Sequence, residues 1–184
     1  MPNNHTHIKV IGLQRSGTNY LQELIKINLN ILVFGNPLEP FFKHAFPNEN
    51  IIKLVKSIYI TPIPQVFIKN NLGILFVLIK KNRNKWLMSV ENYCADLNQK
   101  HGELFNNGVL DKEKAGIFYD NYHSAWENID SPNLIILDYK DILLNFKKVL
   151  ESFNIQPIKQ NNWTNVYKVQ QSNYFTKKKK RLLS

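Results

Sequence analysis

IKVIGLQRSGTNYLQELI (Ile8–Ile25) reads as a β-strand, a tight polar loop and a helix. Its first residues are apolar and largely β-branched, which is typical of a buried strand. After the loop, Tyr20, Leu21, Leu24 and Ile25 recur at the spacing of one helical face. A strand, a glycine-containing loop and a helix in this order are the layout of a phosphate-binding loop.

The two loop glycines, Gly12 and Gly17, have P-loop spacing. In such a loop, backbone N–H groups surround an anion and the dipole of the following helix adds to the attraction. Thr18 and Asn19, however, stand where ATPases and kinases carry lysine and then serine or threonine. A Mg²⁺-nucleoside triphosphate therefore fits this loop poorly, and an anion with fewer phosphates and no metal fits it better.

The loop also carries side-chain donors for an anion. Arg15 can direct a guanidinium at phosphate oxygens, and Ser16, Thr18 and Asn19 add hydroxyl and amide groups. The alternative is a glycine turn without a ligand. The flanking strand and helix, together with the number of donors, favour the anion site.

The rest of the chain continues to alternate strands and helices, interrupted by a proline-rich stretch that predicts loops and short helices. Such alternation predicts a P-loop-like three-layer α/β/α fold around a central, mainly parallel sheet. On the last helix we expect Leu143, Phe146, Val149, Leu150 and Phe153 to form the buried face. The expected elements are strands in 31–34, 73–81 and 132–141 and helices in 82–99, 111–129 and the residues after 141.

Length and composition predict one domain over residues 1–184, ending in a basic tail over 176–184. The formal net charge of +10 favours anionic partners, although a solvated lysine-rich surface explains much of it. Cys94 is the one cysteine, so an internal disulfide is impossible and a reducing compartment is expected. Without a signal-peptide core or a membrane-length apolar run, we expect a cytoplasmic location and no membrane.

Lys81 and Ser89 form a second candidate anion site. Lys81 follows the apolar strand and Ser89 lies eight residues later on the predicted helix, so both side chains can reach one anion. Taken alone, this segment also reads as a solvated basic turn. The loop before it favours the site interpretation.

These motifs resemble the sulfotransferase family. QRSGTNYL (14–21) resembles the family's 5′-phosphosulfate loop, in which a basic residue precedes Ser-Gly-Thr-Thr or Ser-Gly-Thr-Asn and an aromatic residue. Lys81, Asn82 and Ser89 resemble its second signature, a strand ending in Arg-Asn-Pro with a serine eight residues after the arginine. Lys81 stands at the arginine position, so a compact point charge replaces the planar, two-pronged guanidinium. Arg83 stands at the proline position and adds a possible charge contact.

A third match is LIILDYKDILLNF, which resembles the family's strand ending in Tyr-Glu-Asp-Leu. Tyr139, Asp141 and Ile142 carry it, with Lys140 at the glutamate position, and we interpret it as a scaffold signal. The resemblance covers roughly Ile8–Ser89 and Tyr122–Ile155 and is weakest over 35–71.

The resemblance implies 3′-phosphoadenosine 5′-phosphosulfate (PAPS) as sulfuryl donor, without a metal. Arg15 would stabilise the leaving 5′-phosphate electrostatically, since its pKa is too high for a general acid. The implied acceptor is a small molecule or a glycan with a hydroxyl or an amine. The implied donor-binding residues are Gln14, Arg15, Ser16, Gly17, Thr18, Asn19, Lys81 and Ser89.

A general base is expected between the loop and the strand at 73–81, where the family commonly keeps a histidine or a glutamate. PLEPFFKHAFP (37–47) offers His44 as the preferred candidate, with Glu39 as the alternative. Lys43 is a candidate contact for the sulfuryl group. The tail Lys177–Arg181 is either a solvated segment or a contributor to 3′-phosphate binding.

Three alternatives stay open. A P-loop small-molecule kinase would share the fold, but it would lack the Walker lysine and a clear aspartate for Mg²⁺. A nucleic-acid-binding module would use the positive charge, although it leaves the two spaced signatures unexplained, so nucleic acid is not the expected partner. An inactive relative of the sulfotransferases is the third. The sequence does not predict the oligomeric state.

Overall fold

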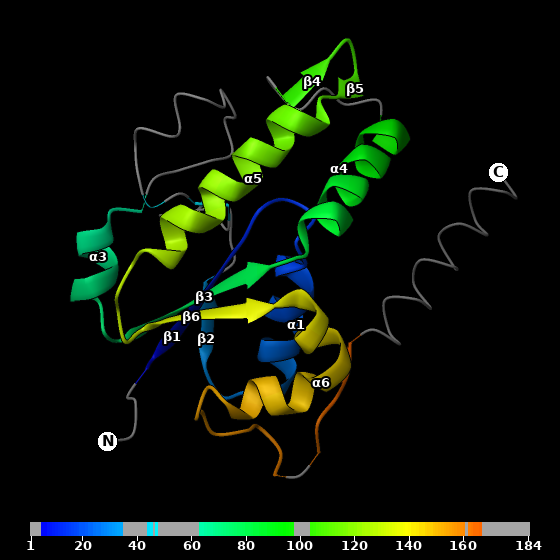
Figure 1. The fold of residues 1–184 in the computed structure, drawn as a ribbon. Helices are drawn as coiled ribbons and strands as arrows, with labels where there is room; N and C mark the ends of the chain where they lie inside the picture. The colour runs from blue at the N-terminus through cyan, green and yellow to red at the C-terminus, as the bar shows by residue number, and fades with distance from the viewer. Residues whose placement is uncertain are drawn as a thin grey trace, which may run out of the picture.

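The computed structural model describes residues 5–34, 44–45, 47, 63–97, 104–160 and 162–166, with side chains up to residue 92 in the helix that ends at 97. A parallel sheet of four strands lies between helices on both faces (Figure 1), which confirms the predicted three-layer α/β/α class. The described elements are β1 (His7–Ile11), α1 (Thr18–Asn28), β2 (Leu32–Phe34), α3 (Gln65–Asn70), β3 (Ile74–Lys80), α4 (Arg83–Leu97), β4 (Phe105–Asn106), β5 (Val109–Leu110), α5 (Lys112–Glu127), β6 (Leu134–Asp138) and α6 (Tyr139–Glu151).

Each face of the sheet has its own hydrophobic core. Along β3, side chains alternate between the faces: Leu75, Val77 and Ile79 pack with α1 and α6, whereas Phe76 and Leu78 pack with α4 and α5. All five are essentially inaccessible to solvent. A strand buried on both faces needs a continuous apolar run, which is why ILFVLI stands out in the sequence.

The strand order is β2-β1-β3-β6, and all three pairings are parallel. The chain leaves β1 toward β2 on one side and leaves β3 toward β6 on the other. The order therefore reverses between β1 and β3, and their carboxyl ends lie side by side, with Ile11 opposite Leu78. In open α/β sheets this reversal point is where ligands bind.

The C-terminal segment returns along α1 and is held there by buried polar groups. Asn28 donates through Nδ2 to the carbonyls of Leu24 (2.8 Å) and Thr164 (2.9 Å) and accepts from the Thr164 N–H (2.7 Å). Tyr20 donates to Asn165 Oδ1 at 3.0 Å. These bonds attach residues 162–166 to the first helix without a strand or helix of their own.

The buried face of α6 differs from the expectation at its start. Val149 and Leu150 are buried as expected, but Leu143 is 38% exposed and Ile142 is fully buried in its place. Asn145 has non-helical dihedral angles (φ −135°, ψ 38°), so the helix is broken in its middle. Helical periodicity does not continue across such a break. Before the break, the buried position is therefore one residue earlier than the periodicity predicts.

Candidate functional site

The loop between β1 and α1 has a backbone conformation that ordinary residues avoid. Arg15 has φ 66° and Gly17 has φ 100°, both in the left-handed region, and the Ser16 N–H closes a turn on the Leu13 carbonyl at 3.1 Å. For a residue with a Cβ, this region costs about 1–2 kcal/mol. Strain of this kind, at Arg15, is typical of ligand-binding loops.

The start of α1 is arranged to receive an anion. Gly17 is its N-cap and makes no side-chain capping bond, and no acidic residue occupies the first turn. The first N–H groups of a helix have no partner inside the helix and carry a partial positive charge. Together with the loop before it, this end of α1 has the geometry and charge that favour an anion, and anion binding there stays a prediction.

Both loop glycines are required by close approach of their neighbours. A Cβ at Gly12 would lie 2.5 Å from Ser16 Oγ and 3.2 Å from the Ile79 carbonyl oxygen. A Cβ at Gly17 would lie 2.3 Å from the ring of Tyr139. The loop is thus packed tightly against the ends of β3 and β6, which fixes its shape.

Ser16 lies inside the loop with its hydroxyl unsatisfied. Its side chain is 1% exposed, and Oγ has no hydrogen-bond partner among the described residues. A buried hydroxyl without a partner costs about 1–3 kcal/mol. Thr18 beside it is also buried, whereas the side chains of Arg15 and Asn19 lie at the surface of the loop.

The structure brings Lys81 and Ser89 together, as the sequence predicts. Lys81 Nζ donates to Ser89 Oγ at 2.6 Å and to the Arg15 carbonyl at 3.3 Å. Ser89 in turn donates to the Lys85 carbonyl at 2.8 Å. The second basic position therefore contacts the first loop directly, and the two form one continuous site.

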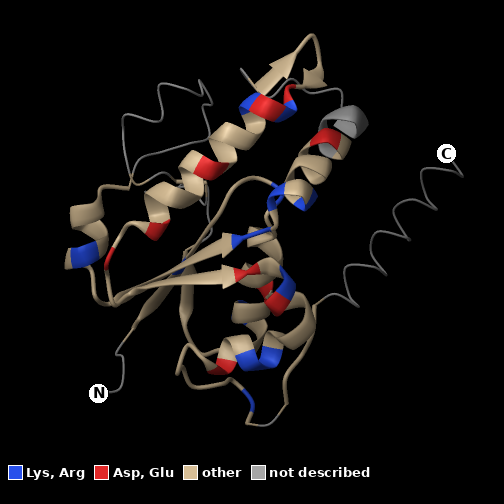
Figure 2. Cartoon of the chain, viewed as in Figure 1, with Lys and Arg blue, Asp and Glu red and all other residues tan. Residues whose placement is uncertain are grey.

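Positive charge is concentrated where β3 runs into α4 (Figure 2). Burial lowers the pKa of Lys81, and the nearby Arg15 and Lys85 charges lower it further. A cation whose pKa is lowered by other cations is stabilised when an anion enters the site. The electrostatics of this edge of the sheet therefore favour a multiply charged anion.

Two aromatic residues fix the loops that carry this charge. Trp86 is 2% exposed and donates through Nε1 to the Gln14 carbonyl at 2.8 Å. Tyr119 donates through its hydroxyl to the Lys81 carbonyl, and its ring lies 5.3 Å from that of Trp86. Trp86 is thus a packing residue that also anchors the loop.

His44 lies against the first loop residue. Its Nδ1 is 2.6 Å from the Gly12 carbonyl oxygen, and its side chain is 6% exposed. A carbonyl only accepts, so Nδ1 carries the proton in this contact and Nε2 is the nitrogen able to accept one. The other candidates in this part of the sequence analysis, Glu39, Lys43 and the tail Lys177–Arg181, lie outside the described residues.

Arg83 is directed toward α5. Its Nε lies 3.2 Å from Asp120 Oδ2 in an ion pair without hydrogen-bond geometry. A Cβ at Gly116 would lie 1.9 Å from its guanidinium, so the side chain runs closely along that helix. The ion pair with Asp120 therefore joins α4 to α5.

Tyr139 is the site residue that sequence reasoning interpreted only as scaffold. Its ring packs on Gly17, and Lys81 Nζ lies 5.3 Å from the ring centroid in a cation–π contact. The available signal was its position: it follows β6 directly, and the carboxyl ends of parallel strands share one edge of the sheet.

No group of three or more His, Cys, Asp or Glu side chains suited to a metal occurs among the described residues. Nor does any helix within those residues combine the length and apolar character needed to cross a membrane.

Comparison with known proteins gives likeness in structure but no match in sequence. No protein-family model matches the chain, and no curated protein matches it. Among solved structures, mouse sulfotransferase SULT7A1 complexed with PAP is similar at 14% sequence identity and a TM-score of 0.44. The match covers 87% of this chain and 61% of the mouse chain, so this chain spans less than two thirds of that protein's length. A likeness this distant carries no functional assignment.

Proposed function

We propose that this protein is a sulfotransferase that moves a sulfuryl group from PAPS to a hydroxyl or amine of a small molecule or glycan. The observation that carries the proposal is the direct contact of the first loop with Lys81 and Ser89 at the reversal point of the sheet. Two separate anion-binding positions, one on each side of that point, suit a nucleotide with a 5′- and a 3′-phosphate. The missing Walker lysine argues against a Mg²⁺-triphosphate.

The donor would bind across both positions. Its 5′-phosphosulfate occupies the loop and the start of α1, and its 3′-phosphate meets Lys81 and Ser89. The loop residues in this role are Gln14, Arg15, Ser16, Gly17, Thr18 and Asn19. Ser16 Oγ, buried and unsatisfied among the described residues, gains a partner in this arrangement.

Sulfuryl transfer needs the donor held in line with the acceptor. The acceptor oxygen forms a bond to sulfur while the bond from sulfur to the bridging 5′-phosphate oxygen breaks. The products are the sulfated acceptor and adenosine 3′,5′-bisphosphate, and the acceptor proton passes to a base. Arg15 stabilises the charge that develops on the leaving phosphate.

His44 is the base in this proposal. Its Nδ1–H donates to the Gly12 carbonyl, which orients the ring and assigns proton acceptance to Nε2. The contact also places the imidazole at the end of β1, beside the loop that holds the sulfuryl group. A base must lie within hydrogen-bond reach of the acceptor proton, and the contact of His44 with the first residue of the loop supports this role.

Calorimetric titration tests the donor site. Wild-type protein and Arg15→Ala are titrated with adenosine 3′,5′-bisphosphate and, separately, with ATP and Mg²⁺. We expect micromolar binding of the bisphosphate, weak binding of ATP and at least a tenfold loss in the variant. A preference for Mg²⁺-ATP would overturn the proposal in favour of a kinase.

Activity is tested separately with PAPS and a panel of phenolic, alcoholic, amine and sugar acceptors. We expect bisphosphate release that depends on the acceptor and is lost in His44→Ala with bisphosphate binding retained. Bisphosphate binding without turnover on any acceptor would point to an inactive relative.

A further inference from the structure

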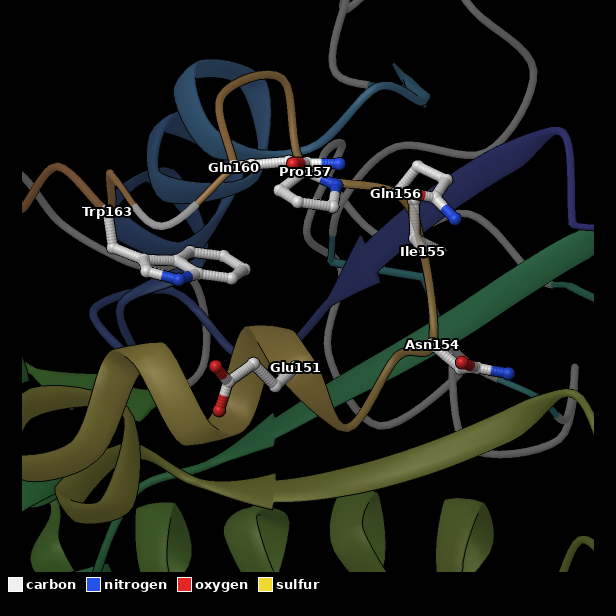
Figure 3. Close-up of a pocket in the computed structure, with 7 residues that line it drawn as sticks. All are labelled: Glu151, Asn154, Ile155, Gln156, Pro157, Gln160 and Trp163. Atoms are coloured by element: carbon white, nitrogen blue, oxygen red, sulfur yellow. The ribbon is translucent and has the colours of Figure 1, made fainter.

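A cavity lies where α6 ends, at the opposite end of that helix from the loop. It has a volume of about 360 Å³ and forms between the end of α6 and the C-terminal segment (Figure 3). This volume falls at the lower end of small-molecule sites, about 300–1,000 Å³. Since α6 begins beside the loop at Tyr139, the 13 residues of this helix lie between the loop and the cavity.

The walls of this cavity are built by a fixed backbone. The Asn30 N–H donates to the Gln156 carbonyl at 2.9 Å, and the Ile158 N–H donates to the Asn28 carbonyl at 2.9 Å. An antiparallel bridge joins the same two segments at Pro157. A site whose walls are already ordered loses little conformational entropy when a ligand binds.

The floor of the cavity is tied down by the buried amide of Asn28. This amide bonds both the N–H and the carbonyl of Thr164, the residue that follows Trp163. The indole of Trp163 is half-buried and packs against the core formed by α1 and α6. Its position is therefore held by the core on one side while it lines the cavity on the other.

The lining combines an aromatic ring with hydrogen-bonding side chains. Trp163 provides the ring, Glu151 a carboxylate, and Asn154, Gln156 and Gln160 provide amides (Figure 3). A carboxylate accepts hydrogen bonds, and an amide both donates and accepts, so together they suit neighbouring hydroxyl groups. The flat indole offers an apolar surface to the C–H face of a ring.

The charge of the lining narrows the ligand class. Among the described residues that line the cavity, Glu151 alone is ionisable, and it opposes an anionic ligand. Lys147 pairs with Glu151 at 3.7 Å, so part of that negative charge is already compensated and a cation is not strongly favoured. The polar amides disfavour a purely apolar molecule. An uncharged polyhydroxylated ring fits best.

We propose that this cavity is a binding site for uncharged saccharide. It is separate from the nucleotide site and does not rest on the proposed function, because none of its described lining residues belongs to the loop.

The test is an NMR titration of the full chain with four uncharged trisaccharides, built from α-linked glucose, β-linked glucose, mannose and N-acetylglucosamine. Trp86 and Trp126 are buried, so the indole N–H of Trp163 reports on this cavity separately. We expect at least one trisaccharide to shift the Trp163 signal with a millimolar or tighter Kd. No shift from any of the four at 20 mM would overturn the proposal.

Variants distinguish the cavity from nonspecific binding. Gln160→Ala and Glu151→Gln alter exposed side chains and are expected to weaken binding at least fivefold with the fold retained. Lys148→Ala, on the same helix but outside the lining, is the matched control and should bind as the wild type does. Equal affinity in all three variants would contradict the site, whatever the outcome at the nucleotide loop.

Discussion

The buried polar groups at the two edges of the sheet differ in how completely they are hydrogen-bonded. At the amino edge, Asn133 is 1% exposed and donates to the carbonyls of Ile68 (2.9 Å), Asn71 (2.9 Å) and Ile74 (3.0 Å). The Asn28 amide likewise hydrogen-bonds both the carbonyl and the N–H of Thr164 in the C-terminal segment. Buried amides at this edge are saturated with hydrogen bonds, so their capacity is used for stability.

At the carboxyl edge, by contrast, some buried polar and charged groups are not fully compensated. Ser16 Oγ is buried without a partner among the described residues, and Arg15 holds a left-handed backbone. Lys81 has its pKa lowered by burial and by neighbouring cations. Unsatisfied hydroxyls, strain and crowded like charges all cost stability, and a bound anion would offset the unsatisfied hydroxyl and the repulsion between the like charges. The contrast indicates which edge is built for folding and which for binding.

The largest expected effect belongs to the amino edge. Asn133→Ala removes the donor to three carbonyl groups, and we expect it to lower the free energy of unfolding by about 4 kcal/mol. Urea unfolding followed by circular dichroism measures this. Asn84→Ala, at an exposed position on α4, is the control and should change stability by about 0.5 kcal/mol at most. A similar small change for Asn133→Ala would remove the basis of the comparison.

His123 tests whether unsatisfied polar atoms alone indicate a binding site. It is 2% exposed, and neither ring nitrogen has a partner within the described residues. Burial, and then the Lys80 charge, lowers its pKa to about 4, with Glu127 opposing. Below pH 6.5 the unfolded chain takes up a proton that the folded chain does not, so stability falls as the pH falls toward 4.

We expect His123 to account for a loss on the order of 3 kcal/mol between pH 7 and pH 4. Urea unfolding at both pH values, in wild type and in His123→Leu, isolates this contribution from that of the carboxylates. The variant should lose less stability on acidification and should bind adenosine 3′,5′-bisphosphate normally. Equal acid sensitivity of the two proteins would show that the histidine titrates normally in the folded state.

Alanine substitutions at two glycines with positive φ distinguish the cost of backbone strain from the cost of a steric contact. Gly17 (φ 100°) packs against Tyr139, whereas a Cβ at Gly108 (φ 82°), in the β4–β5 turn, would meet no atom within 4 Å. We expect Gly108→Ala to cost about 1 kcal/mol and Gly17→Ala about 2 kcal/mol more, measured by thermal unfolding. Adding Tyr139→Ala to Gly17→Ala should remove the contact part of that difference. Equal costs for the two glycines would mean that the loop does not pack as described.

The smallest expected effect is a change in nucleotide affinity that distinguishes Lys81 from the neighbouring Lys80. Lys81→Ala should weaken adenosine 3′,5′-bisphosphate binding about tenfold, or about 1.4 kcal/mol, and leave AMP binding unchanged because AMP lacks the 3′-phosphate. Lys80→Ala is the control, since Lys80 pairs with Glu127 on α5. Calorimetry with both ligands measures the difference. A loss that is equal for AMP and the bisphosphate would place Lys81 outside the 3′-phosphate site.

Much of the fold could be predicted because its signals are local. The apolar run of β3 and the periodicity of α1 and α5 each depend on a few consecutive residues. The buried face of α6 was placed wrongly at Leu143, because the break at Asn145 depends on packing rather than on local propensity. The β4–β5 hairpin was missed, although its Asn107-Gly108 turn carries the usual signal for two positive φ angles.

The site was predictable where a motif lies within one loop and less so where it depends on tertiary contact. The loop and the Lys81–Ser89 pair follow from spacing, and the structure places them together. The contact of Tyr139 with Gly17 joins residues 122 positions apart in the chain, and no periodicity reports such a pair. The roles of Asn28 and Asn133 are hidden for the same reason, because a single asparagine in the sequence gives no sign of its partners.

The most direct test of the contrast between the edges is an amide NMR titration with adenosine 3′,5′-bisphosphate in the absence of metal. We predict shifts in residues 14–19 and at Lys81 and Ser89, with the amides around Asn28 and Asn133 unmoved. Shifts concentrated at the amino edge, or none at millimolar bisphosphate, would contradict the assignment of the carboxyl edge as the anion site.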